Sequence, residues 1–526
     1  MWARVQHLER KTFWPDEVLT AVRVSGHTLT DFRRLFDDRI HPFAEVDAFQ
    51  VRDPRSGPGS VISALAAEEP QHPPLFYVLD HFALDAFGSS VAAYRSVSVA
   101  AGLLSILFAF ALGRIAFGST TGGLVLAALV AVSPFHVQLS RQAREYELFS
   151  NLTLASSALV LWAAARPSFL RWAAYAVGIA LGLYTDPLFA GVIAAHAITV
   201  AATQRTRAAL GGFAAACAAA LLAFAPWAVV LLAGREAAHS QLGWLAGTYP
   251  LKFYAEKWAF NLGTVGFDAE LRDLRLGAFV ALFLLLIAIA SFHALRRAFD
   301  ARPEPAAVLA LGLTAIPPLA FGAYDLVARA HYTTVARYFA GTAVGVELLV
   351  ASWLTACLAT QGRARALGLA VFAAVAAGGI GSDLTAAGAS TWWDNNTQIN
   401  FRSVGAVIDG ARRPLVVVAE PSAALVLDHL IPPDARFLLV SDPARGAAVL
   451  RRSAGPAFLI APSEALKAAV LRSGRALSDV SPANVSAMSE FRAGLSRERP
   501  DLQAALGPDT AANAVWSVGP AGPTSR

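Results

Sequence analysis

Long apolar runs recur between Val91 and Ile380, and this repetition most limits how the chain can fold. Each run approaches the length of about 20 residues that a helix needs to cross the hydrocarbon of a bilayer. Hydrophobic residues make up 56% of the 526 residues and charged residues 15%, whereas soluble domains carry roughly 25% charged residues. We therefore predict a polytopic α-helical membrane protein, with the lipid bilayer as its partner.

The apolar runs predict about ten membrane spans. They cover residues 91–113, 121–139, 148–165, 170–184, 187–202, 210–232, 276–296, 306–324, 339–360 and 366–380. Together they define a transmembrane domain of residues 91–382. Residues 1–90 are predicted to form an outer loop with interfacial helices.

The character of the chain changes after the last span. Short apolar runs at 415–419, 437–440 and 457–460 alternate with helical stretches, a pattern typical of an α/β fold. We expect a small soluble α/β domain over residues 383–506. A disordered tail is expected over residues 507–526, which are rich in Ala, Pro, Gly and Thr.

Basic residues of the short loops predict the orientation of the spans. Alternate loops carry Arg114, the pair Arg166 and Arg171, the pair Arg205 and Arg207, the cluster Arg296, Arg297 and Arg302, and the pair Arg363 and Arg365. Because Lys and Arg mark the cytoplasmic side, the remaining loops and residues 1–90 are expected on the outer face. The net charge of +5 forms no continuous basic stripe, so no nucleic-acid partner is predicted.

Two adjacent carboxylates, Asp16 and Glu17, are expected on the outer face at the start of an interfacial helix. Adjacent helix positions differ by about 100°, so one acid can face a cavity while the other contacts the scaffold. The alternative is helix capping, since acids in a first turn complement the helix dipole.

His72 precedes Pro73 and Pro74, which forbid a helix before them and suit a helix start after them. His72 is therefore predicted at a fixed entry point to a helix. Binding of a divalent cation by His72 and Glu17 is one interpretation. The alternative is a structural role for His72, since a single His is more often a structural group than a metal ligand. No other cofactor is indicated.

Arginines at span boundaries on the outer face form a third group. Arg141 and Arg144 share a helix face. Arg337 stands where a later span begins, and Asp186 lies at a helix junction on the same side. An Arg at a membrane boundary is costly unless it pairs with an anion, and its planar fork suits phosphate. The alternative is snorkelling to lipid headgroups.

The order of these motifs resembles glycosyltransferase family 39 and its GT-C relatives: protein O-mannosyltransferases, lipid A aminoarabinose transferases and rhizobial galacturonosyltransferases. The motifs are Asp16-Glu17, His72-Pro73-Pro74-Leu75-Phe76-Tyr77, Ser133-Pro134-Phe135 and Gln142-Ala143-Arg144-Glu145-Tyr146. The resemblance runs from Phe13 to about Leu161. Farther on, Tyr184-Thr185-Asp186 is similar to the family's Tyr-Thr-His and Ala336-Arg337-Tyr338 to its Pro-Arg-Tyr.

This resemblance implies a GT-C fold and an enzyme that transfers a sugar from a polyprenyl-phosphate donor to a lipid, glycan or protein acceptor. The reaction would occur on the outer face of a bacterial inner membrane, towards the periplasm or the exterior. An acceptor hydroxyl needs a general base, for which Asp16 is the candidate, with Glu17 orienting it or binding a cation. The candidate donor phosphate-binding residues are Arg144, Arg337 and Arg141. The candidate substrate-binding residues are His72, Tyr146 and Asp186.

The alternative function is a non-catalytic transporter or flippase of a polyprenyl-linked or other anionic glycolipid. Transporters usually place ionisable groups near the bilayer midplane and often contain internal repeats. In this sequence the carboxylates of the motifs gather in outer loops, and no repeat is apparent. A catalytically inactive sensor of sugar lipids is also left open, as are the sugar, the acceptor and the oligomeric state.

Residues 1–11 contain no apolar segment. If residues 1–90 lie outside the membrane, some element must carry them across. We expect one further span of about 20 residues before Phe13 in the native protein. The alternative is that the span at 91–113 acts as a reverse anchor.

Overall fold

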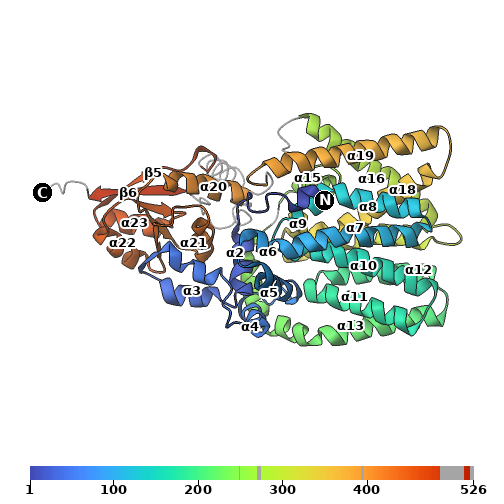
Figure 1. Cartoon of the computed structure of the whole chain (residues 1–526), viewed down its shortest axis with the longest axis horizontal. Helices are drawn as coiled ribbons and strands as arrows, with labels where there is room; N and C mark the ends of the chain where they lie inside the picture. Colours follow the sequence, from blue (N-terminus) through green and yellow to red (C-terminus); the bar gives the residue numbers. More distant parts are fainter. Residues whose placement is uncertain (248, 269–273, 393–395, 486–513, 522–526) are drawn as a thin grey trace. The chain divides into compact units, whose positions relative to one another are not determined.

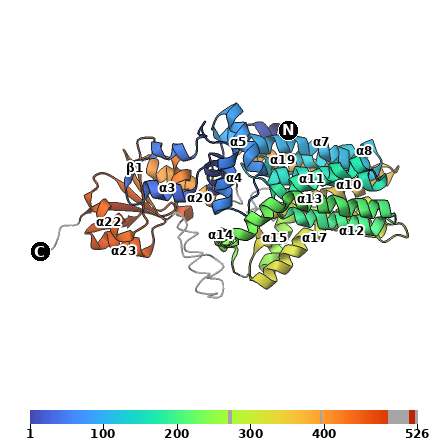
Figure 2. The ribbon, with the colours of Figure 1, turned by 90° about the horizontal axis from the view of Figure 1, so that it is seen from below.

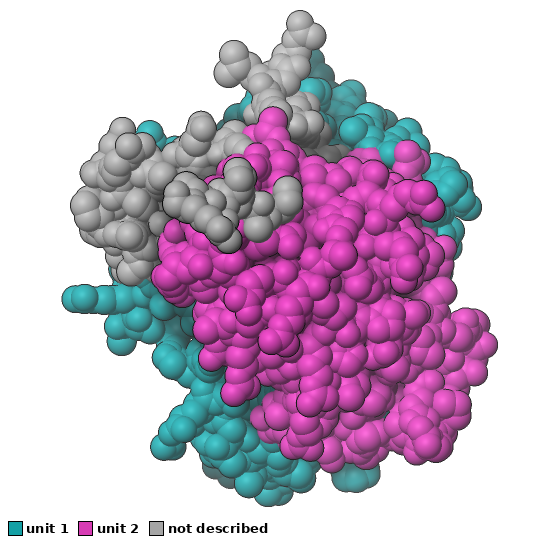
Figure 3. All heavy atoms as spheres, turned by 90° about the vertical axis from the view of Figure 1, so that its left-hand side faces the viewer, with its two compact units in different colours: residues 1–8, 68–79, 95–388 teal, residues 9–67, 80–94, 389–526 magenta. Residues whose placement is uncertain are grey.

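A computed structural model describes residues 1–247, 249–268, 274–392, 396–485 and 514–521. The chain divides into two compact units, coloured separately in Figure 3. The first, which we call the helical unit, comprises residues 1–8, 68–79 and 95–388. The second, the mixed unit, comprises residues 9–67, 80–94 and 389–526.

The helical unit is built from long helices that run side by side (Figures 1 and 2). Its elements are α1 (Trp2–Val5), α7 (Ser96–Phe117), α8 (Thr120–Val132), α9 (Pro134–Ser140), α10 (Tyr146–Ala165), α11 (Phe169–Thr185), α12 (Phe189–Thr203), α13 (Arg207–Ala233), α14 (Arg235–Gln241), η3 (Gly243–Leu245), α15 (Leu251–Gly263), α16 (Leu274–Ala298), α17 (Pro305–Ala328), η4 (Tyr332–Thr334), η5 (Ala336–Phe339), α18 (Ala340–Leu358) and α19 (Arg363–Gly388).

Each predicted span coincides with an apolar helix or helix pair of the described residues. Seven helices are long and apolar enough to cross a membrane, and α8 with α9 makes an eighth if the two are one bent span. The helices α11 and α12 are apolar but shorter. The chain is therefore a multi-pass helical membrane protein, as predicted. Two helices of this unit were not predicted: α14 and α15 lie in the connection between the predicted spans at 210–232 and 276–296.

The predicted second span is broken rather than straight. The helices α8 and α9 meet at an angle of 60°, because Pro134 cannot continue the hydrogen-bond ladder of α8 and starts α9 instead. The hydroxyl of Ser133 at the break donates to the Val265 carbonyl at 2.7 Å. The break therefore turns α9 out of line with α8 and places a polar residue between them.

The mixed unit contains one sheet and its covering helices. Its strands are β1 (Ile40–Pro42), β2 (Leu415–Val418), β3 (Arg436–Leu439), β4 (Ala457–Ile460), β5 (Arg475–Asp479) and β6 (Val515–Ala521). Its other elements are α2 (Pro15–Val24), α3 (Leu29–Phe36), η1 (Phe43–Glu45), η2 (Asp47–Phe49), α4 (Pro58–Glu68), most of α5 (Leu75–Phe87), α6 (Val91–Tyr94), α20 (Asn396–Asp409), α21 (Pro421–Asp428), α22 (Pro443–Arg452) and α23 (Glu464–Arg472).

The strand order is β1-β3-β2-β4-β6-β5. The three central strands are parallel, with Val417 opposite Leu438 and Leu459 in the two registers. These strands were predicted as short, continuously apolar runs, as expected for a parallel sheet covered by helices. The antiparallel strands β1, β6 and β5 complete the edges.

Two boundaries differ from the prediction. Strand β1 comes from the amino-terminal 90 residues, which were expected to form a separate outer loop, and His41 pairs with Phe437 of β3. Residues 515–521 were assigned to a disordered tail but form β6, in which Val515 and Val518 are buried. In both cases a short strand gains its hydrogen bonds from a distant partner, which local composition does not reveal.

Leu438 tests the core of the mixed unit, because its side chain is 0% exposed within a cluster of aliphatic residues. We expect Leu438→Ala to lower the free energy of unfolding of this unit by about 2–5 kcal/mol, through lost burial and the cavity left behind. The measurement is the urea dependence of proteolysis of the detergent-solubilised full chain. Leu471→Ala is the control, since Leu471 is 55% exposed, and an equal loss in both variants would contradict this core assignment.

Candidate active site

The predicted site residues are divided between the two units. The helical unit holds His72, Arg141, Arg144, Tyr146, Asp186 and Arg337. The mixed unit holds Asp16 and Glu17. Each group is described by itself.

A buried carboxylate that the sequence analysis gave no role, Glu145, organises the first group. Its Oε1 lies 3.0 Å from His72 Nδ1 and 3.2 Å from a terminal nitrogen of Arg144. The same Arg144 nitrogen lies 3.2 Å from His72 Nε2. The Tyr77 hydroxyl donates to Glu145 Oε2 at 3.5 Å. The four side chains therefore form one hydrogen-bonded cluster.

These contacts determine the proton arrangement on His72. A guanidinium can only donate, so Nε2 accepts from Arg144 and the Nδ1 proton is donated to Glu145. Burial opposes ionisation of Glu145, but the charge of Arg144 and the interaction with His72 outweigh it and lower the Glu145 pKa to about 2. Glu145 is thus an anion that orients one cation and one neutral imidazole.

Tyr146 joins this cluster to the second predicted arginine. The guanidinium carbons of Arg144 and Arg337 each lie 5.8 Å from the centre of the Tyr146 ring. Arg337 also lies over the rings of Trp244, at 5.6 Å, and Tyr338, at 5.5 Å. Aromatic faces attract cations. The two guanidinium groups are therefore held around a shared aromatic surface.

Local structure explains why these side chains meet. The helix α5 begins at Leu75, directly after the two prolines, so His72 stands just outside the helix start, as predicted. Arg144 and Glu145 end the turn between α9 and α10, and the Arg144 carbonyl accepts from Ser98 of α7 at 3.1 Å. Arg337 lies in η5, directly before α18. The site is therefore built from residues that border helices.

Asp186 belongs to the same electrostatic environment. It follows the end of α11 and accepts a hydrogen bond from the Leu188 amide at 2.8 Å. Burial and the negative charge of Glu145 raise the pKa of Asp186 from 3.8 to about 7. Asp186 can therefore hold a proton near neutral pH beside an ionised carboxylate.

Arg141 does not join this cluster. Its guanidinium donates to the carbonyls of Ala3 and His7, the second at 3.2 Å. The side chain is only 2% exposed. It ties the amino-terminal residues to the α9–α10 turn, although the sequence analysis grouped it with Arg144.

In the mixed unit, Asp16 and Glu17 occupy the first turn of α2, after Pro15 at its first position. Asp16 is half-buried and Glu17 fully buried, so the two adjacent acids have different surroundings. Asp80, also fully buried, has its pKa raised well above the ordinary value by burial and by the charge of Glu17. The sequence analysis assigned Asp80 no role in the site. The available signal was a carboxylate among the largely apolar residues of α5.

No group of three or more His, Cys, Asp or Glu side chains among the described residues is arranged to hold a metal ion. His72, one candidate ligand, contacts Glu145 and Arg144 through its two ring nitrogens. Glu17, the other candidate, belongs to the mixed unit.

The raised pKa of Asp186 predicts a pH-dependent stability. Between pH 3.8 and about 7 the folded state keeps a proton that the unfolded state releases, so stability falls as pH rises through this window. Asp186→Asn cannot titrate, and we expect a smaller fall in the unfolding temperature between pH 5 and pH 8 than in the wild type.

The measurement is thermal unfolding of the detergent-solubilised full chain at each pH. Asp300→Asn, at an exposed position, is the control and should behave like the wild type. Glu145 contributes no pH dependence between pH 5 and pH 8, because its pKa is 4.5 in the unfolded chain and about 2 in the folded state. Identical pH dependence in Asp186→Asn and the wild type would show that Asp186 does not hold the proton.

Several solved structures are similar to this chain. ArnT from Cupriavidus metallidurans bound to undecaprenyl phosphate aligns over 85% of this chain and 88% of that chain, with 14% identity and a TM-score of 0.49. The same protein in the apo state aligns over 85% of this chain and 87% of that chain, with 14% identity and a TM-score of 0.47. The Archaeoglobus fulgidus oligosaccharyltransferase in complex with Zn and sulfate has 12% identity and a TM-score of 0.48, over 83% of this chain and 62% of that chain.

No curated protein matches the chain. A family model does match: dolichyl-phosphate-mannose-protein mannosyltransferase, over residues 71–231. This segment contains His72, Arg144 and Asp186, and it begins later than Phe13, where the motif resemblance was expected to start. The match confirms the predicted resemblance to the GT-C glycosyltransferases over this segment and supports a membrane glycosyltransferase.

Proposed function

We propose that this chain transfers a sugar from a polyprenyl-phosphate donor to a lipid, glycan or protein acceptor. The observation that carries the proposal is the pair of guanidinium groups, Arg144 and Arg337, each 5.8 Å from the Tyr146 ring. The matched family is named for a dolichyl-phosphate-linked sugar donor, which belongs to the same chemical class. We propose the outer face of an inner membrane as the location, from the Arg bias of the loops.

The two guanidinium groups support an anionic ligand. Arg144 and Arg337 lie around the same Tyr146 ring, and a planar guanidinium can donate to two oxygens of one phosphate group. Two such groups around one ring therefore favour a phosphate ligand.

In the proposed reaction, the bond between the anomeric carbon and the phosphate oxygen breaks, and negative charge grows on the leaving polyprenyl phosphate. Arginines held in place before the reaction stabilise that charge without reorganisation in the transition state. Glu145 and His72 supply this orientation for Arg144, through contacts of 3.2 Å each. Tyr146, with its ring close to both guanidinium groups, is the proposed substrate-facing aromatic residue.

Asp16 is the proposed general base, and this role is argued from its chemistry. The acceptor hydroxyl must lose a proton as its oxygen attacks the anomeric carbon, and a carboxylate can accept it. Asp16 is half-buried, whereas its neighbour Glu17 is fully buried beside Asp80. Because Asp16 is the more exposed of the two, it is suited to contact a substrate, whereas the buried Glu17 is suited to contact neighbouring residues of the protein.

A second candidate function is favoured by one observation. His136, Glu147 and Glu347 are buried within the helices α9, α10 and α18, and intramembrane ionisable groups are common in transporters. A transporter or flippase would move a polyprenyl-linked glycolipid without forming a product. Incubating the purified chain with a radiolabelled polyprenyl-phosphate sugar and a membrane extract separates the two, because only the transferase yields a labelled acceptor.

Arg144→Lys is expected to raise the donor KM about ten-fold or more while changing the acceptor KM little. Lysine keeps the charge but loses the planar fork that meets two phosphate oxygens. The measurement is steady-state transfer with each substrate varied in turn. The matched control is Arg171→Lys, since Arg171 stacks over Trp162 at 4.4 Å and donates to nearby carbonyls. Equal effects on donor and acceptor would contradict the phosphate role.

Asp16→Asn is expected to lower kcat by about 10²–10⁴-fold with normal insertion into membranes, because the amide keeps the shape of the carboxylate but cannot take a proton. The readout is single-turnover transfer by purified protein. Asp31→Asn changes an acid in the first turn of α3 and controls for loss of a helix-end charge. Near-normal turnover in Asp16→Asn would remove Asp16 as the base.

A further inference from the structure

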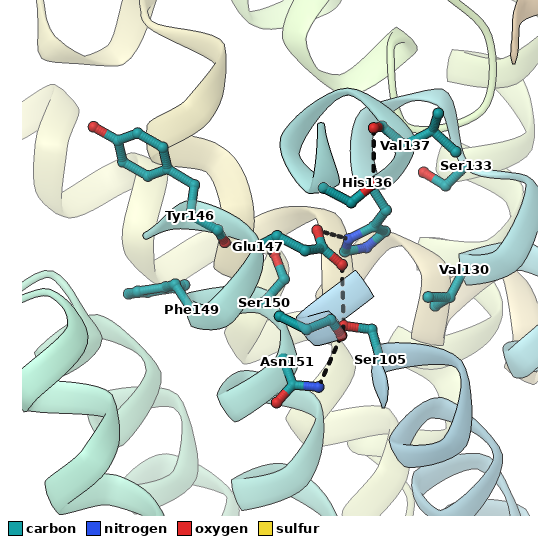
Figure 4. Close-up of polar contacts among 12 residues, drawn as sticks. Ser105, Val130, Ser133, His136, Val137, Tyr146, Glu147, Phe149, Ser150 and Asn151 are labelled. Carbon is teal, nitrogen blue, oxygen red and sulfur yellow. Dashed lines mark hydrogen bonds and ion pairs between the residues drawn. The ribbon is translucent and has the colours of Figure 1, made fainter. Parts of the chain in front are cut away.

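A second buried cluster lies in the helical unit, apart from the contacts of Glu145. His136 of α9 lies between two carboxylates, with Nδ1 3.0 Å from Glu147 Oε2 of α10 and Nε2 3.1 Å from Glu347 Oε2 of α18. Figure 4 shows the imidazole beside Glu147, with Ser105 on the other side of that carboxylate. The Ser105 hydroxyl lies 3.0 Å from Glu147 Oε1. One histidine therefore connects two helices.

The two hydrogen bonds require two protons on the three side chains. Either the imidazole carries both, between two carboxylates, or a neutral imidazole carries one and a glutamic acid the other. In both arrangements the cluster bears one net negative charge. Arg4 interacts electrostatically with both glutamates and is itself held by the carbonyls of Val130 and Ala131, each at 2.8 Å. The charge is thus balanced inside the unit, as burial demands.

The two candidate phosphate-binding arginines lie shortly before the starts of the two bridged helices, Arg144 before α10 and Arg337 in η5 before α18. Glu147 is three residues after Arg144, in the first turn of α10. Glu347 is seven residues after Ala340, the first residue of α18, which corresponds to about 10 Å along the helix at about 1.5 Å per residue. The starts of the two helices also touch, since the rings of Tyr146 and Tyr338 lie 6.2 Å apart. α10 and α18 are therefore connected at two separate levels.

We propose that His136 is a positioning residue that sets the separation of Arg144 and Arg337 by bridging Glu147 and Glu347; the inference rests on the proposed function. The aromatic contact between Tyr146 and Tyr338 can slide, because ring contacts tolerate many geometries. The two hydrogen bonds of His136 are directional. Without them only contacts of lower directionality set the position of α18 against α10, and a shift of about 1 Å at a phosphate site is costly.

Glu347→Ala is the informative variant. It removes the bridge to α18 but leaves His136 paired with Glu147, so no charge is left buried alone. We expect the Kd for undecaprenyl phosphate to rise about ten-fold and kcat to fall by at least as much, because the displaced arginines also stabilise the charge that grows in the transition state. Glu347→Gln keeps an acceptor oxygen for His136 and should restore the affinity to within about three-fold of the wild type.

His196→Leu is the control for loss of buried hydrogen bonds between helices at a place away from the contact of α10 with α18. His196 of α12 contacts Ser157 at 3.0 Å and Tyr175 at 3.1 Å, and these contacts connect α10, α11 and α12 rather than α10 and α18. We expect this variant to lower the unfolding temperature as Glu347→Ala does, yet to leave the Kd for undecaprenyl phosphate unchanged.

The experiment uses the full chain in nanodiscs and measures undecaprenyl phosphate binding, donor KM, kcat and thermal unfolding for all four proteins. Weak binding in Glu347→Ala alone supports the inference. Wild-type affinity in Glu347→Ala, or equal losses in Glu347→Ala and His196→Leu, overturns it and leaves the proposed function standing. If the wild type binds no undecaprenyl phosphate and the Arg144→Lys variant has the same donor KM as the wild type, both the proposed function and this inference are overturned.

Discussion

Charges within the helical unit must be satisfied by the protein itself, because hydrocarbon offers neither hydrogen bonds nor strong screening. Several helices of the unit are placed by this requirement. Arg4 donates to the carbonyls of Val130 and Ala131 close to the break between α8 and α9. His136 forms hydrogen bonds with two carboxylates from different helices. The pairing of buried charges therefore accompanies apolar packing wherever α9, α10 and α18 meet.

The candidate active site follows the same rule. Glu145 is ionised because a guanidinium and an imidazole proton face it, despite its burial. Burial, together with the negative charge of Glu145, raises the pKa of Asp186 to about 7. One paired carboxylate thus orients Arg144 and contributes to the protonation of a neighbouring acid.

Much of the fold was predictable because its signals are local. Apolar length predicted the spans, and the prolines after His72 predicted the start of α5 at Leu75. Continuous apolar runs predicted the parallel strands, with β4 at Ala457–Ile460 as expected. The strand β1 could not be predicted, since three residues of ordinary composition become a strand only by pairing with β3.

The sequence by itself determined the membrane-spanning class, the α/β character of the carboxyl-terminal segment and the residue types from which the candidate site is built. Only the tertiary structure decided which of those residues act together. Arg141 and Arg144 are three positions apart, yet one donates to backbone carbonyls and the other joins Glu145. The reason is physical: the role of an arginine depends on which acceptors lie within hydrogen-bonding reach, and these come from segments distant in the chain. Glu347 pairs with His136 for the same reason.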